Sequence, residues 1–97
     1  MRTEEIKDAP VVNRTKRAGE WLACESYDLD RAERRLWVEI PAGFTEMQSE
    51  EPQLALAWRM ATRAIFTSYF GRGYRAVDFA LDKVNGRGRY LLALRDA

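Results

Sequence analysis

The fold is decided by the stretch RLWVEIP at residues 35–41, together with the long amphipathic segment at residues 49–70. Leu36, Val38 and Ile40 alternate with charged or bulky neighbours, which is the period-two pattern of a half-buried strand. Pro41 ends this strand, because proline has no N–H to donate to a neighbouring strand. The sequence therefore predicts one short strand here, with one apolar face.

A long helix is predicted after this strand. Residues 42–48 form a loop, Ser49 is the expected N-cap, and the helix runs to about Phe70, where Gly71 or Gly73 ends it. Several apolar residues recur at helical spacing and predict the face that packs on a sheet: Leu54, Ala57, Trp58, Ala61, Ala64, Ile65 and Tyr69.

A β-hairpin is predicted after the helix. Residues 76–82 alternate in polarity, and Val77, Phe79 and Leu81 are expected to point inward. Asn-Gly at positions 85–86 indicates a tight turn, because both residues tolerate positive φ. The returning strand covers residues 90–94.

The amino-terminal part is less patterned. Residues 1–17 are polar and are interpreted as a flexible arm or linker, which leaves residues 18–97 as a single domain. Residues 20–27 form a possible first strand and residues 28–34 a turn. The expected fold is α+β, a small and mostly antiparallel sheet of three or four strands with one long helix packed on a face.

Composition excludes several classes of function. The chain has 97 residues, with 16 Lys plus Arg and 15 Asp plus Glu, so it lacks the excess of positive charge that nucleic-acid binding requires. It has no histidine, which removes histidine-based nucleophile pairs and histidine metal sites, and no metal is expected. A single cysteine, Cys24, and the lack of a long apolar run predict a cytoplasmic protein that does not enter membranes.

The segment between residues 10 and 94 resembles the C-terminal part of a bacterial family of predicted GNAT-superfamily N-acetyltransferases. It would cover about the last third of a full-length member. The similar stretches are PVVNRT at 10–15, VEIPA at 38–42, WRMATR at 58–63 and RGYRAVDF at 72–79, together with YFGRGY at 69–74, which resembles the end of the last GNAT helix.

This resemblance implies acetyl transfer from acetyl-CoA to an amine, if an N-terminal half or a partner completes the enzyme. It also implies a role for Tyr69, because in many such enzymes a tyrosine at this place protonates the departing CoA thiolate. The alternative is that Tyr69 is a core aromatic on the packed face of the helix. No general base is identified. Glu39 is the only acidic residue within a strand that could face a substrate groove, and the alternative is that it is a solvated strand residue.

Two stretches have the glycine spacing of a cofactor loop. Residues 68–73 lie at a helix C-terminus, where the dipole repels phosphate, so residues 83–88 are the better candidate. Lys83, Gly86, Arg87 and Gly88 follow a strand and match the spacing of a CoA pyrophosphate loop. Such a loop needs the N–H groups and positive dipole of a helix that begins directly after it, so residues 89–97 would have to be helical. The Asn-Gly turn favours a strand there instead, and both interpretations stay open from the sequence.

Three aromatic residues, Trp37, Phe66 and Phe70, are expected to be exposed in an isolated domain. They predict a partner surface for a homodimer or for a complementing N-terminal acetyltransferase half. The alternative function is a non-catalytic small oligomerising or partner-binding domain, so the sequence leaves open whether this chain is an enzyme.

Overall fold

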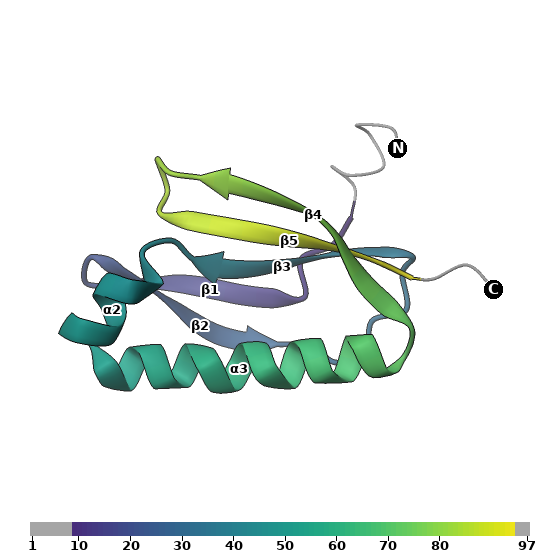
Figure 1. Cartoon of the computed structure of the whole chain (residues 1–97), viewed down its shortest axis with the longest axis horizontal. Coiled ribbons are helices and arrows are strands. Elements are labelled where there is room, and N and C mark those ends of the chain that lie inside the picture. Colours follow the sequence, from purple (N-terminus) through teal and green to yellow (C-terminus); the bar gives the residue numbers. More distant parts are fainter. Residues whose placement is uncertain (1–8, 95–97) are drawn as a thin grey trace.

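The computed structural model describes residues 9–94 of the chain. In chain order the elements are β1 (Asn13–Ala18), β2 (Trp21–Tyr27), β3 (Arg35–Pro41), α2 (Phe44–Glu50), α3 (Pro52–Gly71), β4 (Tyr74–Asp82) and β5 (Arg87–Leu94). Figure 1 shows the long helix α3 lying along one side of the molecule. The fold is α+β, as the sequence predicts.

The strands form two antiparallel sheets. The larger sheet has the order β3-β5-β4, so the last strand of the chain lies between β3 and the edge strand β4. β1 and β2 form a separate two-stranded hairpin. The prediction of a single small sheet therefore describes only the larger of the two.

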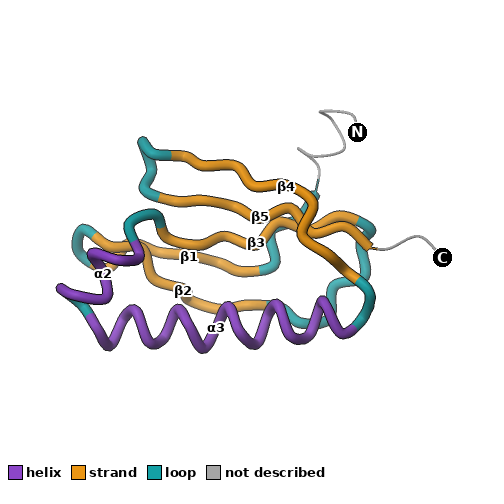
Figure 2. The backbone as a smooth tube through the Cα atoms, viewed as in Figure 1, coloured by secondary structure: helices purple, strands orange, loops and turns teal. Residues whose placement is uncertain are grey.

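The two sheets are joined along β1 and β3. The N–H of Val12 donates to the carbonyl of Trp37 at 2.8 Å, and the N–H of Trp37 donates to the carbonyl of Pro10 at 2.8 Å. The next connection between the sheets is made by the side chain of Asn13. Its Oδ1 accepts from the N–H of Glu39 at 2.8 Å, and its Nδ2 donates to the Glu39 carbonyl at 2.7 Å. A buried amide thus replaces the backbone pairing between the sheets, and Figure 2 shows β1 running beside β3.

Helix α3 closes the core from one side. Its residues Ile65 and Tyr69 pack against Leu36, Val38 and Leu92 of the larger sheet, all of them fully buried. Nearer its start, Trp58 packs on the β1–β2 hairpin and donates from its indole Nε1 to the Leu22 carbonyl at 2.7 Å. The residues of α3 that are buried are Ala55, Trp58, Ala61, Ile65 and Tyr69.

The start of the helical region differs from the prediction. Residues 42–48 are not a loop, since α2 occupies Phe44–Glu50, and Ser49 lies inside α2 instead of capping α3. Gly43 has a left-handed conformation with φ 72°, which turns the chain directly into α2, and the buried Met47 anchors it. Pro52 then prevents a continuous helix, because it lacks an N–H and disfavours helical geometry at Glu51 (φ −136°), so α3 begins anew.

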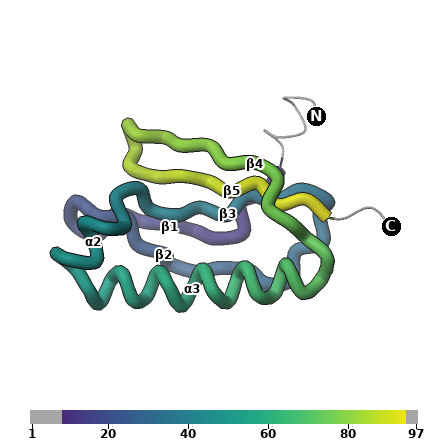
Figure 3. The backbone as a smooth tube through the Cα atoms, viewed as in Figure 1, coloured from purple at the N-terminus to yellow at the C-terminus, as the bar shows by residue number. Residues whose placement is uncertain are grey.

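The boundary of the domain also differs from the prediction. Residues 13–17 belong to β1 and Val12 is buried in the core, so the structured domain begins before residue 18. Residues 1–8 of the expected arm lie outside the described part of the chain. Figure 3 shows how the described N-terminal segment runs directly into β1.

Burial of two groups of side chains is the reverse of the prediction. The sequence predicts that Val77, Phe79 and Leu81 point inward, yet all three are exposed. α3 contacts β4 where the strand begins, at the buried Tyr74. The β4 residues from Arg75 to Leu81 are all exposed, so α3 does not cover these three side chains. The sequence also predicts an exposed Trp37, yet only 8% of it is accessible, because the segment before β1 pairs with it.

Candidate ligand groove on the open face of the sheet

Tyr69 lies in the core, in agreement with the alternative that it is a core aromatic. Its ring is fully buried, and its hydroxyl donates to the Asp28 carbonyl at 2.6 Å and accepts from the N–H of Arg31 at 3.2 Å. Both backbone partners belong to the segment between β2 and β3. The hydroxyl therefore holds this segment, and it is not presented to a ligand.

The rest of the YFGRGY stretch serves the same purpose. The Arg72 guanidinium donates to the carbonyls of Leu29 at 2.6 Å and Arg31 at 3.1 Å, and it lies over the Tyr69 ring at 4.5 Å. The Tyr74 hydroxyl donates to the Glu33 carbonyl at 2.5 Å. Burial raises the pKa of Tyr74. Tyr69, Arg72 and Tyr74 thus fix the segment of residues 28–34 against the C-terminal end of α3 through hydrogen bonds to its backbone.

The expected cofactor-binding residues do not lie at a helix N-terminus. Lys83 and Gly86 are in the turn between β4 and β5, while Arg87 and Gly88 begin strand β5. Gly86 has φ 66°, as the Asn-Gly turn requires. Because residues 87–94 form a strand, the helix dipole that a pyrophosphate loop uses is missing at this turn.

Gly88 is small for a packing reason. A Cβ at this position would lie 2.6 Å from Cζ of Phe79, so the Phe79 ring lies directly over the glycine backbone. Cross-strand cover of a glycine by an aromatic ring stabilises a hairpin. The glycine spacing at positions 86 and 88 is therefore explained by the hairpin itself.

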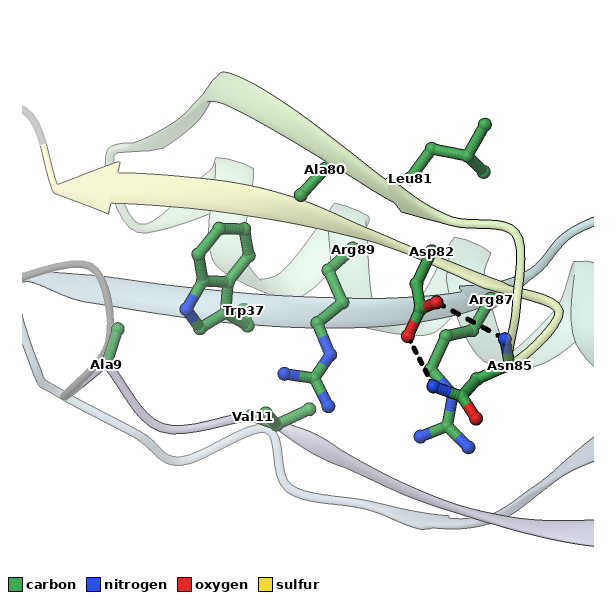
Figure 4. A pocket seen from close by; sticks show the side chains of 9 residues that line it. All are labelled: Ala9, Val11, Trp37, Ala80, Leu81, Asp82, Asn85, Arg87 and Arg89. Carbon is green, nitrogen blue, oxygen red and sulfur yellow. Dashed lines mark hydrogen bonds between the residues drawn. The ribbon is translucent and has the colours of Figure 1, made fainter. Parts of the chain in front are cut away.

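A cavity lies on the face of the larger sheet that is opposite to α3, here called the open face. It has a volume of about 520 Å³. Figure 4 shows Trp37 from β3, Arg87 and Arg89 from β5 and Asp82 from β4 at this groove, with Val11 on the opposite wall. The groove combines an aromatic wall with two guanidinium groups.

A buried carboxylate organises these cations. Glu39 is 3% exposed, and its Oε1 lies 2.5 Å from Nη1 of Arg87. Arg89 is farther away, with 3.8 Å between its Nη2 and Oε2 of Glu39. One acidic group thus faces two cations, which leaves the Arg89 guanidinium with donors for an incoming anion. The fourth charge, Asp82, is turned to the hairpin, where Nδ2 of Asn85 donates to it at 2.7 Å.

Sequence reasoning identifies part of this groove. It names Arg87 as part of a cofactor loop, and Arg87 lines this groove. Glu39, the acidic residue expected to face a substrate groove, does not line it and instead contacts Arg87. Sequence reasoning misses that Trp37 and Arg89 join Arg87, because the pairing of Trp37 with the N-terminal segment is long-range. Alternation alone places residues 37 and 39 on one face, which is the signal that was available.

The described residues show no metal-binding group and no membrane-spanning helix. No group of three or more His, Cys, Asp or Glu side chains in residues 9–94 is arranged to hold a metal ion. Cys24 is partly buried, and this burial raises the pKa of its thiol. Within the same residues, neither helix has the length and apolar character needed to cross a bilayer.

Comparison of the chain with models of known protein families, with curated proteins and with solved structures yields no match. The residues and the geometry of the groove are therefore the basis for a functional assignment.

Proposed function

We propose that this chain is the C-terminal, acceptor-side segment of a GNAT-like N-acetyltransferase, and that another polypeptide supplies the acetyl-CoA-binding half. The observation that carries the proposal is the element order β3, α3, β4, β5, a strand, a long helix and an antiparallel hairpin. The motifs at residues 38–42, 58–63 and 72–79 fall on these elements in the order that the resemblance implies.

The reaction would be acetyl transfer to an amine. The amine nitrogen attacks the thioester carbonyl carbon, the C–S bond breaks, the nitrogen loses a proton and the CoA thiolate gains one. In this proposal the groove holds the acceptor, and Arg89 binds an acidic group on it through a charge-assisted hydrogen bond. Tyr69 as the acid would require the segment of residues 28–34 to release its hydroxyl.

We assign acetyl-CoA binding to another polypeptide because the hairpin turn of this chain is not followed by a helix N-terminus. The pyrophosphate of CoA needs converging N–H groups at a helix N-terminus, and the residues after the turn form strand β5. We therefore expect the isolated chain to bind acetyl-CoA too weakly to be measured at millimolar ligand. Titration calorimetry, with the mass in solution recorded on the same sample, measures this.

The decisive experiment first searches the neighbouring genes for one that encodes an acetyl-CoA-binding half. It then pairs that polypeptide with the chain and monitors CoA release with a thiol reagent against a panel of amines. We expect release only when both polypeptides are present, and a loss of about tenfold or more in kcat/KM for acidic acceptors in Arg89→Gln. The matched control is Arg59→Gln, an exposed change on α3. Absence of turnover from the pair with every amine, or tight acetyl-CoA binding by the chain alone, would contradict the proposal.

A second candidate is a non-catalytic partner-binding domain. It is favoured by the exposed apolar side chains of β4 and of the outer face of α3, Leu56, Met60, Phe70, Val77, Phe79 and Leu81. Trp37, which the sequence places on such a surface, is buried and does not contribute. A paired sample that binds tightly but shows no CoA release would select this candidate.

A further inference from the structure

Strand β4 is an edge strand with an open side. Eight of its nine residues have a register partner in β5 along one side, and no described strand pairs with the other side. Phe79 is 43% exposed and Leu81 is 52% exposed. Figure 1 shows β4 rising from the end of α3 and then running along the outer edge of the sheet. A long apolar edge of this kind is a template for pairing with another strand.

β4 has some of the features that protect an edge, since it carries three charged residues and the Asp78 carboxylate accepts from the Phe79 N–H at 2.8 Å, a bond that pairing at Phe79 would replace. Residues 74–82 contain no proline and no lysine, two residues that commonly protect edges. They do contain a bulge, since the register with β5 shifts between Ala76 and Asp78. The bulge decides which side chains share a face, and it therefore decides how β4 can pair with itself.

The register with β5 assigns the faces. Ala76, Phe79 and Leu81 lie opposite Leu92, Tyr90 and Gly88, on the face toward α3. The β4 residues that have a register partner on the open face are Arg75, Asp78, Ala80 and Asp82. The bulge places Val77 and Asp78 together against Leu91, so Arg75 and Asp82 lie at equal effective distances on either side of Phe79.

We propose that β4 pairs antiparallel with β4 of a second copy of this chain, around a two-fold axis at Phe79. In this register Phe79 lies opposite Phe79 of the second copy, and Leu81 lies opposite Ala76 on the same face. On the open face Asp82 of each copy lies opposite Arg75 of the other, so the pairing forms two identical ion pairs. Each Asp82 carboxylate keeps its hydrogen bonds to Asn85 and accepts from Arg75 with its remaining lone pairs. The axis makes the interface isologous, with the same patch used by both copies.

The Phe79 contact extends a row of rings that already exists. Phe70 stacks on Phe66 with ring centroids 5.3 Å apart, Phe66 meets Tyr90 at 5.7 Å, and Tyr90 meets Phe79 at 4.8 Å. In the pair of copies this row continues from Phe79 to Phe79 and then through the second copy. Aromatic cross-strand pairs are among the more stabilising contacts in sheets.

Charge and face together select this register over its neighbours. A slip by one residue would place the apolar side chains of one copy on the polar face of the other. A slip by two residues keeps the faces but moves Arg75 away from Asp82, so both ion pairs are lost. A net charge of +1 gives little repulsion between copies.

A charge-swap series tests the register. We expect the wild-type chain to associate reversibly to a dimer in sedimentation equilibrium over a concentration series. Arg75→Asp and Asp82→Arg each place like charges opposite one another at two sites and should weaken the dimer about tenfold or more. The double variant R75D/D82R restores opposite charges at both sites and should recover the wild-type affinity.

Oxidative cross-linking tests the axis. In a Cys24→Ser background, Phe79→Cys places two thiols directly opposite each other and should give a disulfide-linked dimer on a non-reducing gel. Leu56→Cys, an exposed position on α3, is the matched control and should remain monomeric. Circular dichroism establishes that each variant is folded.

Three results would overturn the proposal. The first is a wild-type chain that stays monomeric at every concentration. The second is a dimer that neither charge swap weakens, and the third is equal cross-linking of the Phe79→Cys and Leu56→Cys variants. The inference does not depend on the proposed acetyltransferase role, since all measurements use the chain alone without acetyl-CoA.

Discussion

Strands β3 and β4 of this protein share an alternating sequence pattern and have opposite environments. β3 supplies Leu36 and Val38 to the covered core, which also includes Ile65, Tyr69 and Leu92, and all five are fully buried. β4 runs into the hairpin arm, residues 78–89, where its alternating apolar side chains Phe79 and Leu81 are exposed. Alternation therefore assigns a side chain to a face, while burial depends on whether another layer reaches that face.

The largest expected effect comes from the same substitution made in both regions. Leu36→Ala should lower the free energy of unfolding by about 2–5 kcal/mol, because it leaves a cavity in a fully buried site. Leu81→Ala, in the hairpin arm, should change it by about 0.5 kcal/mol or less in the monomer. Urea unfolding at low protein concentration measures both, and equal losses would contradict the distinction between the two regions.

The connection between the two sheets through Asn13 is expected to contribute to the stability of the whole domain. Asn13→Ala removes two buried hydrogen bonds to the Glu39 backbone and should cost about 2 kcal/mol. The amide of Glu39 should also lose protection in hydrogen exchange. The exposed change Arg14→Ala is the matched control. Retained protection at Glu39 in the Asn13 variant would show that the backbone pairing alone holds the sheets together.

Tyr69 provides a smaller test inside the covered core. Tyr69→Phe keeps the ring but leaves the Asp28 carbonyl and the Arg31 N–H without their partner, so a loss of about 1 kcal/mol is expected in urea unfolding. Tyr27→Phe, at an exposed tyrosine, should be neutral. Unchanged stability of the Tyr69→Phe variant, together with lost acetyl transfer in the completed enzyme, would instead support the acid role.

The smallest expected effect is a local pH dependence in the hairpin arm. Hydrogen bonds from the Asn85 side chain and backbone lower the pKa of Asp82. A lowered carboxyl pKa stabilises the turn at pH values above that of an ordinary aspartate, and this contribution disappears as the pH falls through the lowered pKa. The Asn85 amide resonance should therefore titrate with a midpoint below about 3.9, the usual aspartate value.

The matched control for this titration is Asp82→Asn, which should abolish the transition while leaving the hairpin formed. The covered core should show no corresponding change over this range. A midpoint at or above the usual aspartate value would contradict the hydrogen bonds between Asp82 and Asn85.

The candidate groove was only partly foreseeable. Alternation along β3 places Trp37 and Glu39 on one face, and the Asn-Gly turn places Arg87 and Arg89 at the start of a strand. The contact between Glu39 and Arg87 depends on β5 pairing beside β3, which joins residues far apart in the sequence. Local patterns carry no information on that choice of neighbour.

Local sequence alone is enough to predict the strand at residues 35–41, the long helix that ends near Gly71, and the final hairpin. These elements depend on local periodicity and on turn residues, which act within a few positions. The helix α2 before the long helix is not predicted from the sequence, because it is anchored by the buried Met47 and depends on packing.

The identity of the covered apolar faces depends on tertiary contacts. Trp37 is buried because the segment before β1 pairs with it, and Phe79 is exposed because α3 does not extend over this part of β4. Both outcomes result from where one element ends relative to another in space. Burial is a property of two surfaces that meet, so a pattern on one of them cannot determine it.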